Sequence, residues 1–278
     1  MDRISPFGKA WRLLAMLCIA GLFLFPFFSV FSASLRPPGL PPPRTVEWIP
    51  SPTTWRNYGE IFRMLPFGRY LANSLFVTAV AIPLTLVTAS MAGYATARLS
   101  PRPRLMIVYL AITLQIIPVT ALWLPRFLIV KWLGLMDTYA ALWLPVLMGS
   151  APLYVLLYYR SCVSVPPSLY EAAELDGAST LKVWWRIAMP LARSTTMAVS
   201  ALTFAMYWSD YINPLLYLKS QDRFTLPLGL QQLQQLDKTN WPLLMAASAV
   251  LILPAAIVFL LIQRFFLQES RLGGSSGW

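Results

Sequence analysis

The sequence predicts an all-α, polytopic membrane protein with six transmembrane helices. Of the 278 residues, 57% are apolar and only 12% are charged, whereas a soluble domain carries about 25% charged residues. The mean hydropathy is +0.59. Six stretches are long, apolar and free or almost free of charge, and each approaches the roughly 20 residues that a helix needs to cross the hydrocarbon core.

The six predicted spans follow one another along the whole chain. They are residues 13–35, 70–97, 105–125, 138–159, 187–209 and 239–263. The fifth span contains one charge, Arg193 near its start, where a long side chain can reach the headgroups. The first span follows Arg3, Lys9 and Arg12, as a signal peptide would, but its 23 uncharged residues exceed the roughly 7–15 of a signal-peptide core. We therefore expect a retained anchor.

Six spans place both termini on the same side of the membrane. Arg98, Arg102 and Arg104 lie in a short connection without any acid. Because basic connections favour the cytoplasm, we expect the termini inside. Residues 1–12 are then a cytoplasmic N-terminus, 36–69 a proline-rich, extended external segment, and 268–278 a cytoplasmic tail. The net charge of +11 fits loops that face anionic lipid better than a nucleic-acid surface.

The composition also excludes several kinds of active site. The chain has no histidine, which rules out histidine-ligated zinc and a Ser-His-Asp triad. Cys18 and Cys162 are far apart and lack the CxxC spacing of redox or metal sites. The chain also lacks the GxxxxGK[ST] loop that cradles ATP phosphates. We expect no catalytic residue, no metal and no cofactor.

The connection between the fourth and fifth spans, residues 165–190, is too polar to cross a bilayer and too patterned for a slack loop. Ser168 with Glu171 has the spacing of a capping box, which predicts the start of a short helix. Asp176 and Gly177 predict a turn. Ser179 predicts the cap of a second short helix. Two interpretations remain open: a handle for a basic partner protein, or a helix–turn–helix that only closes the bundle.

This connection resembles the EAA motif of binding-protein-dependent ABC importer permeases. Glu171-Ala172-Ala173, Gly177, Ile187 and Pro190 fall at the spacings of that motif, and Met189 stands where leucine is usual. In the family this loop is the coupling helix, which docks in a cleft on the cytosolic ATPase subunit. The resemblance therefore assigns ATPase coupling to Glu171, Ala172, Ala173, Asp176, Gly177, Ile187 and Pro190.

Other stretches resemble the carbohydrate-uptake, MalG-like group of these permeases. They include Asn57-Tyr58, Ala92-Gly93-Tyr94-Ala95, Gly134-Leu135 with Thr138-Tyr139, and 225–230. The resemblance implies the type I ABC importer permease fold, with a five-helix core at 70–267. It also implies half of a sugar-translocation pore in a bacterial or archaeal cytoplasmic membrane. The implied partners are a second permease subunit, two ATP-binding cassette subunits that hydrolyse the ATP, and an extracytoplasmic solute-binding protein.

Two further groups of residues are candidates on the external side and along the solute path. By resemblance, the polar loop with Gln231, Gln234, Gln235 and Lys238 reaches toward the binding protein. Trp208 and Asn213 are candidates for the substrate path, because sugar faces stack on aromatic rings, although tryptophans near span ends usually form the interfacial belt.

Two rival functions remain open from the sequence. A permease of the same architecture could carry glycerol phosphate, an amino acid or phosphate. An ATP-independent secondary transporter is less favoured, since such carriers generally hold charges at mid-membrane and no span has one centrally.

Overall fold

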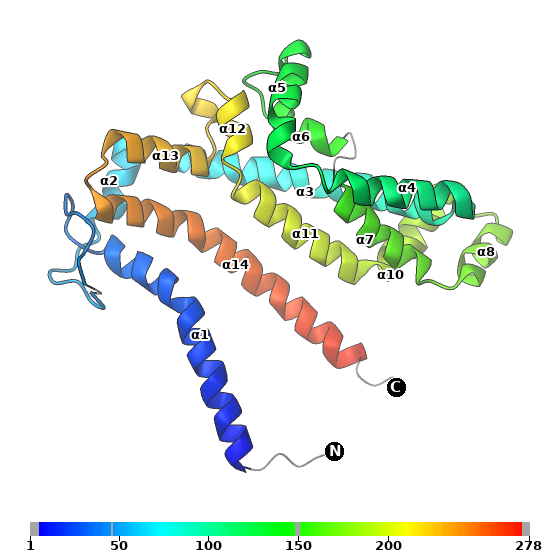
Figure 1. Ribbon diagram of the computed structural model, residues 1–278, viewed down its shortest axis with the longest axis horizontal. Helices are drawn as coiled ribbons and strands as arrows, with labels where there is room; N and C mark the ends of the chain where they lie inside the picture. The colour runs from blue at the N-terminus through cyan, green and yellow to red at the C-terminus, as the bar shows by residue number, and fades with distance from the viewer. Residues whose placement is uncertain (1–5, 46, 148–150, 274–278) are drawn as a thin grey trace. The chain divides into compact units, whose positions relative to one another are not determined.

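The computed structural model describes residues 6–45, 47–147 and 151–273, and within them every regular element is helical. The prediction of an all-α protein is therefore confirmed (Figure 1). The α-helices are α1 (Pro6–Ser34), α2 (Arg56–Met64), α3 (Phe67–Ala97), α4 (Pro101–Leu114), α5 (Trp123–Trp132), α6 (Ala140–Leu147), α7 (Pro152–Val163), α8 (Pro167–Leu175), α9 (Thr180–Val183), α10 (Met189–Leu191), α11 (Arg193–Trp208), α12 (Ile212–Tyr217), α13 (Leu226–Leu236) and α14 (Trp241–Gly273). Short 3-10 turns η1 (Val119–Leu122) and η3 (Gln221–Arg223) and a π-helical turn η2 (Trp184–Ala188) join them.

Three helices in the described part of the chain are long and apolar enough to cross a membrane unbroken: α1, α3 and α14. Two pairs qualify only as bent spans, α4 with η1 and α5 at 95°, and α6 with α7 at 42°. The first bend occurs where Pro118 adopts an extended conformation, because proline lacks the amide that would continue the helix.

The predicted fifth span, 187–209, is interrupted in the structure. Its long piece, α11, has 16 residues and begins after Ala192, which leaves helical geometry (φ −88°, ψ 19°). The π-helical turn η2 and the three-residue α10 precede it. The count of six continuous spans is therefore not confirmed, although helix covers most of every predicted span.

The chain divides into two compact units. One combines 1–68 with 229–254, and the other combines 69–228 with 255–278. Within the second unit, α5, α6 and α12 gather at one end, and α8 lies at the opposite end (Figure 1). A buried apolar cluster that includes Val77, Val130, Leu142 and Tyr217 joins α3 to α5, α6 and α12.

A close helix crossing lies at Gly93, where α3 passes α7. A Cβ placed on Gly93 would lie 2.6 Å from the Cβ of Tyr158 and 2.8 Å from the carbonyl oxygen of Val155. Only hydrogen fits at this distance, so Gly93 allows the two helices to meet.

Two segments that looked like loops contain regular structure. The segment 36–69, which the sequence predicts to be external, holds α2 and is fixed by side-chain hydrogen bonds, so it is more than an extended linker. The segment 210–238 holds α12, η3 and α13. The two longer helices, α2 and α13, pack isoleucine or leucine side chains inward. Ile61 of α2 and Leu233 of α13 are fully buried, because one apolar stripe is enough to anchor a surface helix.

Candidate functional site

The connection between α7 and α11 begins with the short helix α8. Pro166 is extended (φ −53°, ψ 129°) and Pro167 is the first helical residue, a position where proline loses no hydrogen bond. Ser168 therefore lies inside the helix, and no side chain caps its start. The predicted capping box is wrong, because the two prolines already fix where the helix begins. Glu171 is thus relieved of the capping role and stands exposed on α8.

The end of α8 is a left-handed turn at Gly177. Gly177 has φ +76°. Its amide donates to the carbonyl of Glu174 (2.9 Å), and the amide of Ala178 donates to that of Ala173 (3.0 Å). These two bonds form a Schellman motif, in which glycine is strongly preferred. The predicted turn at Asp176-Gly177 is confirmed. No atom lies within 4 Å of a Cβ built on Gly177, so the chain leaves this position open.

The connection returns to the bundle through α9 and η2. The hydroxyl of Ser179 accepts a hydrogen bond from the amide of Lys182 (3.4 Å), so the predicted cap of the second helix is confirmed. Ile187 lies half-buried in η2, and Pro190 lies in α10, three residues before α11 begins. The motif residues therefore lie in three places: the exposed helix α8, the tight turn at Gly177, and the segment η2–α10 that leads back to α11.

An aromatic and ionic contact fixes α8 to the C-terminal end of α3. Arg98, which directly follows α3, forms an ion pair with Glu174 of α8. The guanidinium of Arg98 also lies 5.6 Å from the ring centre of Tyr94 and 5.9 Å from that of Tyr170. The two tyrosine rings meet edge to face at 5.9 Å. The sequence gives no local signal for this contact, because Arg98 and Glu174 are 76 residues apart.

Beneath α8, Tyr170 is the helix's buried anchor. Its hydroxyl donates to the carbonyl of Cys162 (3.4 Å), and burial raises the pKa of Tyr170 to about 12. Beside it lies a cavity of about 290 Å³ whose lining includes Arg98, Arg104 and Glu171. Glu171 thus borders a recess that it shares with two arginines.

The exposed side of the connection also carries large apolar side chains. Leu175, directly before the turn, is 89% exposed, and Leu181 of α9 is exposed as well. Ala172 and Ala173 precede Leu175 on α8. An apolar residue at such a tip is the kind of group that a protein partner buries. Sequence reasoning did not single out Leu175, although its place between two acids was a signal.

The three predicted binding-protein glutamines lie on one helix face instead of a loop, and Lys238 lies just beyond that helix. Gln231, Gln234 and Gln235 belong to α13 at spacings of three and four, which places them on the same face. Gln234, Gln235 and the following Lys238 are exposed, and Gln231 is half-buried. The three glutamines therefore form a ridge at the C-terminal end of α13.

The two candidate path residues have structural partners within the chain. Trp208 is 3% exposed, and its ring stacks on Phe204 with centroids 5.4 Å apart. The amide of Asn213 donates to the carboxylate of Asp210 (2.8 Å), which also accepts from the Asn213 backbone. Both residues lie around the start of α12. Among the described residues, no cluster of histidine, cysteine and acidic groups could hold a metal.

Comparison with known proteins shows which family and which relatives this chain resembles. The family model described as "Binding-protein-dependent transport system inner membrane component" matches residues 85–271. The arabinooligosaccharides transport system permease protein AraQ of Halalkalibacterium halodurans is 31% identical over 266 residues, which covers 93% of each chain. The sulfoquinovosyl glycerol transport system permease protein SmoH of Agrobacterium fabrum is 29% identical over 97% of this chain and 95% of its own.

Solved structures share the fold. A chain of a bacterial ABC transporter for import of the acidic polysaccharide alginate superposes with a TM-score of 0.76 at 21% identity, covering 96% of this chain and all of its own. A chain of the alginate transporter in complex with a pentasaccharide-bound periplasmic protein gives a TM-score of 0.62 at 17% identity, covering 97% of each chain. The predicted permease fold is confirmed.

Proposed function

This chain belongs to the family of binding-protein-dependent transport system inner membrane components, and we propose that it is one permease subunit of an ATP-driven sugar importer. It is a multi-pass inner-membrane protein. In the proposed complex a second permease subunit completes the translocation pore, two ATP-binding cassette subunits hydrolyse ATP, and an external binding protein delivers the sugar. The sugars named for the relatives and the resemblance of 225–230 to carbohydrate permeases support this cargo class.

The observation that carries the proposal is the exposed helix α8 held on a fixed base. In our proposal α8 docks on the ATPase through Glu171, Ala172, Ala173 and Asp176, and the open space at Gly177 admits the partner's backbone. Ile187 and Pro190 transmit the movement into α11. An ATP-driven change can bias the solute path only if it distinguishes two states of the permease, and a rigid handle provides that connection.

The remaining site residues take roles that follow from their positions. The glutamine ridge of α13, Gln231, Gln234 and Gln235 with Lys238, would face the binding protein. Trp208 and Asn213 would lie along the solute path, with Trp208 acting through its packing. This arrangement assigns both termini and residues 165–190 to the cytoplasm, and 36–69 to the external side.

Purification of the tagged chain from its native membrane tests the proposal. We expect an ATPase subunit and a second permease subunit to co-purify, and the liganded binding protein to stimulate ATP hydrolysis of that complex. Screening sugars against glycerol phosphate, amino acids and phosphate as ligands of the binding protein then identifies the cargo. Solute transport by the purified chain without any ATPase would contradict the proposal and support a secondary transporter.

A further inference from the structure

The segment after α1 folds back along the helix that it has just left. The ring of Trp48 lies 6.0 Å from that of Phe25 and 5.7 Å from that of Phe28, centre to centre. These phenylalanines precede Ser34, the last residue of α1, by nine and six positions. At about 1.5 Å per residue, they lie roughly 14 Å and 9 Å below the end of the helix.

That depth reaches into the hydrocarbon layer. The apolar part of α1, Trp11–Ser34, has 24 residues, a length of about 36 Å. Centred in a hydrocarbon core of about 30 Å, it extends roughly 3 Å past each boundary. Phe28 then lies roughly 6 Å and Phe25 roughly 11 Å inside the boundary. Trp48 contacts both rings and therefore lies at the level of the acyl chains.

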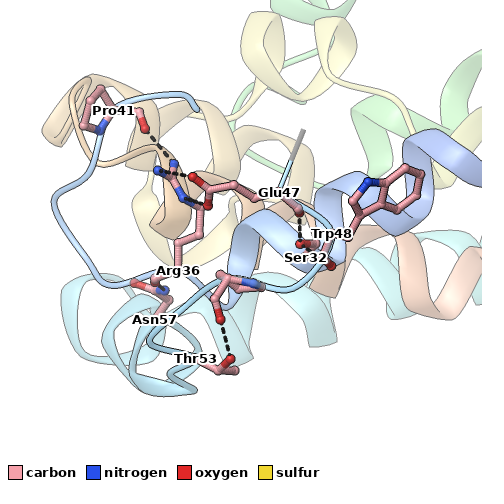
Figure 2. Close-up of polar contacts among 8 residues, drawn as sticks. Ser32, Arg36, Pro41, Glu47, Trp48, Thr53 and Asn57 are labelled. Carbon is pink, nitrogen blue, oxygen red and sulfur yellow. Dashed lines mark hydrogen bonds and ion pairs between the residues drawn. The ribbon is translucent and has the colours of Figure 1, made fainter. Parts of the chain in front are cut away.

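Side-chain hydroxyls pair the backbone carbonyls of Glu47, Trp48 and Pro50 where the segment folds back (Figure 2). The hydroxyl of Ser32, itself buried, donates to the carbonyls of Glu47 (2.7 Å) and Trp48 (3.1 Å). The hydroxyl of Thr53 donates to the carbonyl of Pro50 (2.7 Å). Unpaired carbonyls are costly in lipid, and these bonds remove that cost for the carbonyls of Glu47, Trp48 and Pro50.

The carboxylate of Glu47, next to Trp48 in the chain, turns away to pair with Arg36. Arg36 forms an ion pair with Glu47 (2.9 Å) and donates to the carbonyl of Pro41 (2.8 Å). The amide of Asn57 donates to the carbonyls of Ser34 (2.8 Å), the last residue of α1, and Arg36 (2.7 Å), just beyond it. The segment is thus a closed, amphipathic structure with its polar groups paired around Arg36.

The apolar tip itself is uncovered. Trp48 is 62% exposed and Ile49 is 82% exposed. A cavity of about 160 Å³ lies beside them, lined mainly by Phe28, Phe31, Leu35, Trp48, Ile49 and Pro50. Tryptophan is enriched where a protein meets the lipid interface, and the exposed tip side chains at 48 and 49 offer no charge for recognition by another protein.

We propose that residues 48–50, the tip segment, are inserted into the lipid leaflet in which α1 ends, and that an acyl chain occupies the adjoining cavity. The partner is the bilayer itself. Trp48 and Ile49 anchor the segment, while the Arg36–Glu47 pair stays at the headgroup level and holds the tip in this orientation. The inference goes beyond transport, since the proposed importer function requires no lipid contact at this position.

Site-directed spin labelling of the whole complex in lipid nanodiscs tests the insertion. Ile49→Cys is labelled with a nitroxide in a Cys18→Ala background, where the remaining Cys162 is buried. Arg44→Cys, an exposed position on the same segment, is the matched control. A sample without an added cysteine measures background labelling, and sugar uptake by each variant verifies its fold.

We expect the label at 49 to collide at least several-fold more with oxygen, which concentrates in lipid, than with a water-soluble nickel chelate. The label at 44 should show the reverse preference. Equal nickel-chelate access at both positions would overturn the proposal by placing the tip in water. Low collision rates with both reagents at 49 would also overturn it, because a protein such as the second permease subunit would then cover the tip. Neither result bears on whether the complex imports sugar.

Discussion

At the scale of single residues, substitutions of Gly177 can distinguish two effects: strain in the backbone and obstruction of a docked partner. Its φ of +76° disfavours side chains, yet the chain itself leaves the Cβ position empty. Alanine therefore adds strain of about 1 kcal/mol, while asparagine tolerates the left-handed conformation with little strain. Both substitutions put new atoms where the proposed ATPase contact lies.

We expect Gly177→Asn to leave the melting temperature of the complex nearly unchanged and to reduce sugar uptake at least tenfold. Gly177→Ala should reduce uptake similarly and also lower the melting temperature slightly. Uptake assays paired with thermal denaturation separate the two effects. Wild-type uptake by Gly177→Asn would show that nothing docks closely at this turn.

Asp137 holds two connections of the second unit together. It adopts φ +60°, and its carboxylate accepts hydrogen bonds from the hydroxyl and the amide of Ser220 and from the amide of Lys219. These bonds, chiefly those from Ser220, together with the charge of Arg223 (3.2 Å), lower the pKa of Asp137 from 3.8 to about 2. The folded state therefore favours the ionised carboxylate.

The lowered pKa predicts acid sensitivity in a defined window. The stabilisation by Asp137 is complete above pH 3.8 and is lost as the pH falls through about 2. Because the group is partly solvated, we expect a contribution of about 1–2 kcal/mol. Asp137→Asn tolerates the backbone conformation and removes the charge. Its melting temperature should be lower at pH 7 and should fall less between pH 4 and 2 than that of the wild type; parallel curves would contradict this role.

At the scale of elements, α8 is coupled to α3 by the Arg98–Glu174 pair. Both side chains are partly exposed, so the pair contributes little to stability, typically 0–1 kcal/mol. In the proposed mechanism the pair instead transmits movement. If α8 is fixed to α3, displacement of α8 by the ATPase also displaces α3, whereas a loosely attached α8 would move alone.

Charge reversal tests this connection. Arg98→Glu and Glu174→Arg should each lower uptake several-fold, because like charges then face each other, and the double variant should regain most of the uptake. Glu60→Arg, which breaks the ion pairs of Glu60 on α2, is the control and should not affect coupling. Failure of the double variant to recover would show that the pair is not the connection.

The crossing of α3 and α7 makes a separate prediction about stability. Gly93→Ala places a methyl group against backbone atoms of α7, and such overpacking costs about 1–3 kcal/mol. Gly59→Ala in α2 meets open space and should stabilise by up to about 1 kcal/mol through helix propensity. The two alanine variants should shift the melting temperature in opposite directions. Equal shifts would exclude a tight crossing.

The elements that could be predicted from sequence are those governed by local rules. Long apolar runs predicted α1, α3 and α14, and Gly177 and Ser179 predicted the turn and the cap within residues 165–190. Local rules failed where two of them competed, as at Ser168, where Pro166 and Pro167 start α8 before serine can cap it. The Arg98–Glu174 pair and the fold-back of Trp48 along α1 depend on tertiary packing and leave no periodic signal.

At the scale of the whole molecule, the sequence contains no phosphate-binding loop, so in the proposed importer the chain contributes part of the solute path and the contact with the ATPase. Its helices are broken at several points, including Pro118 and Ala192, and broken spans allow parts of a bundle to move as separate bodies. In this account the energy for that movement enters from the ATPase subunits through α8. Transport should therefore require ATP hydrolysis.

The most direct test measures both activities together in proteoliposomes that contain the complete complex and the sugar-loaded binding protein. We predict uptake that requires ATP hydrolysis, and Gly177→Asp should abolish uptake while the chain stays in the membrane and the complex still hydrolyses ATP. Sugar uptake that continues without ATP, or uptake at the wild-type rate in the Gly177→Asp complex, would contradict the account.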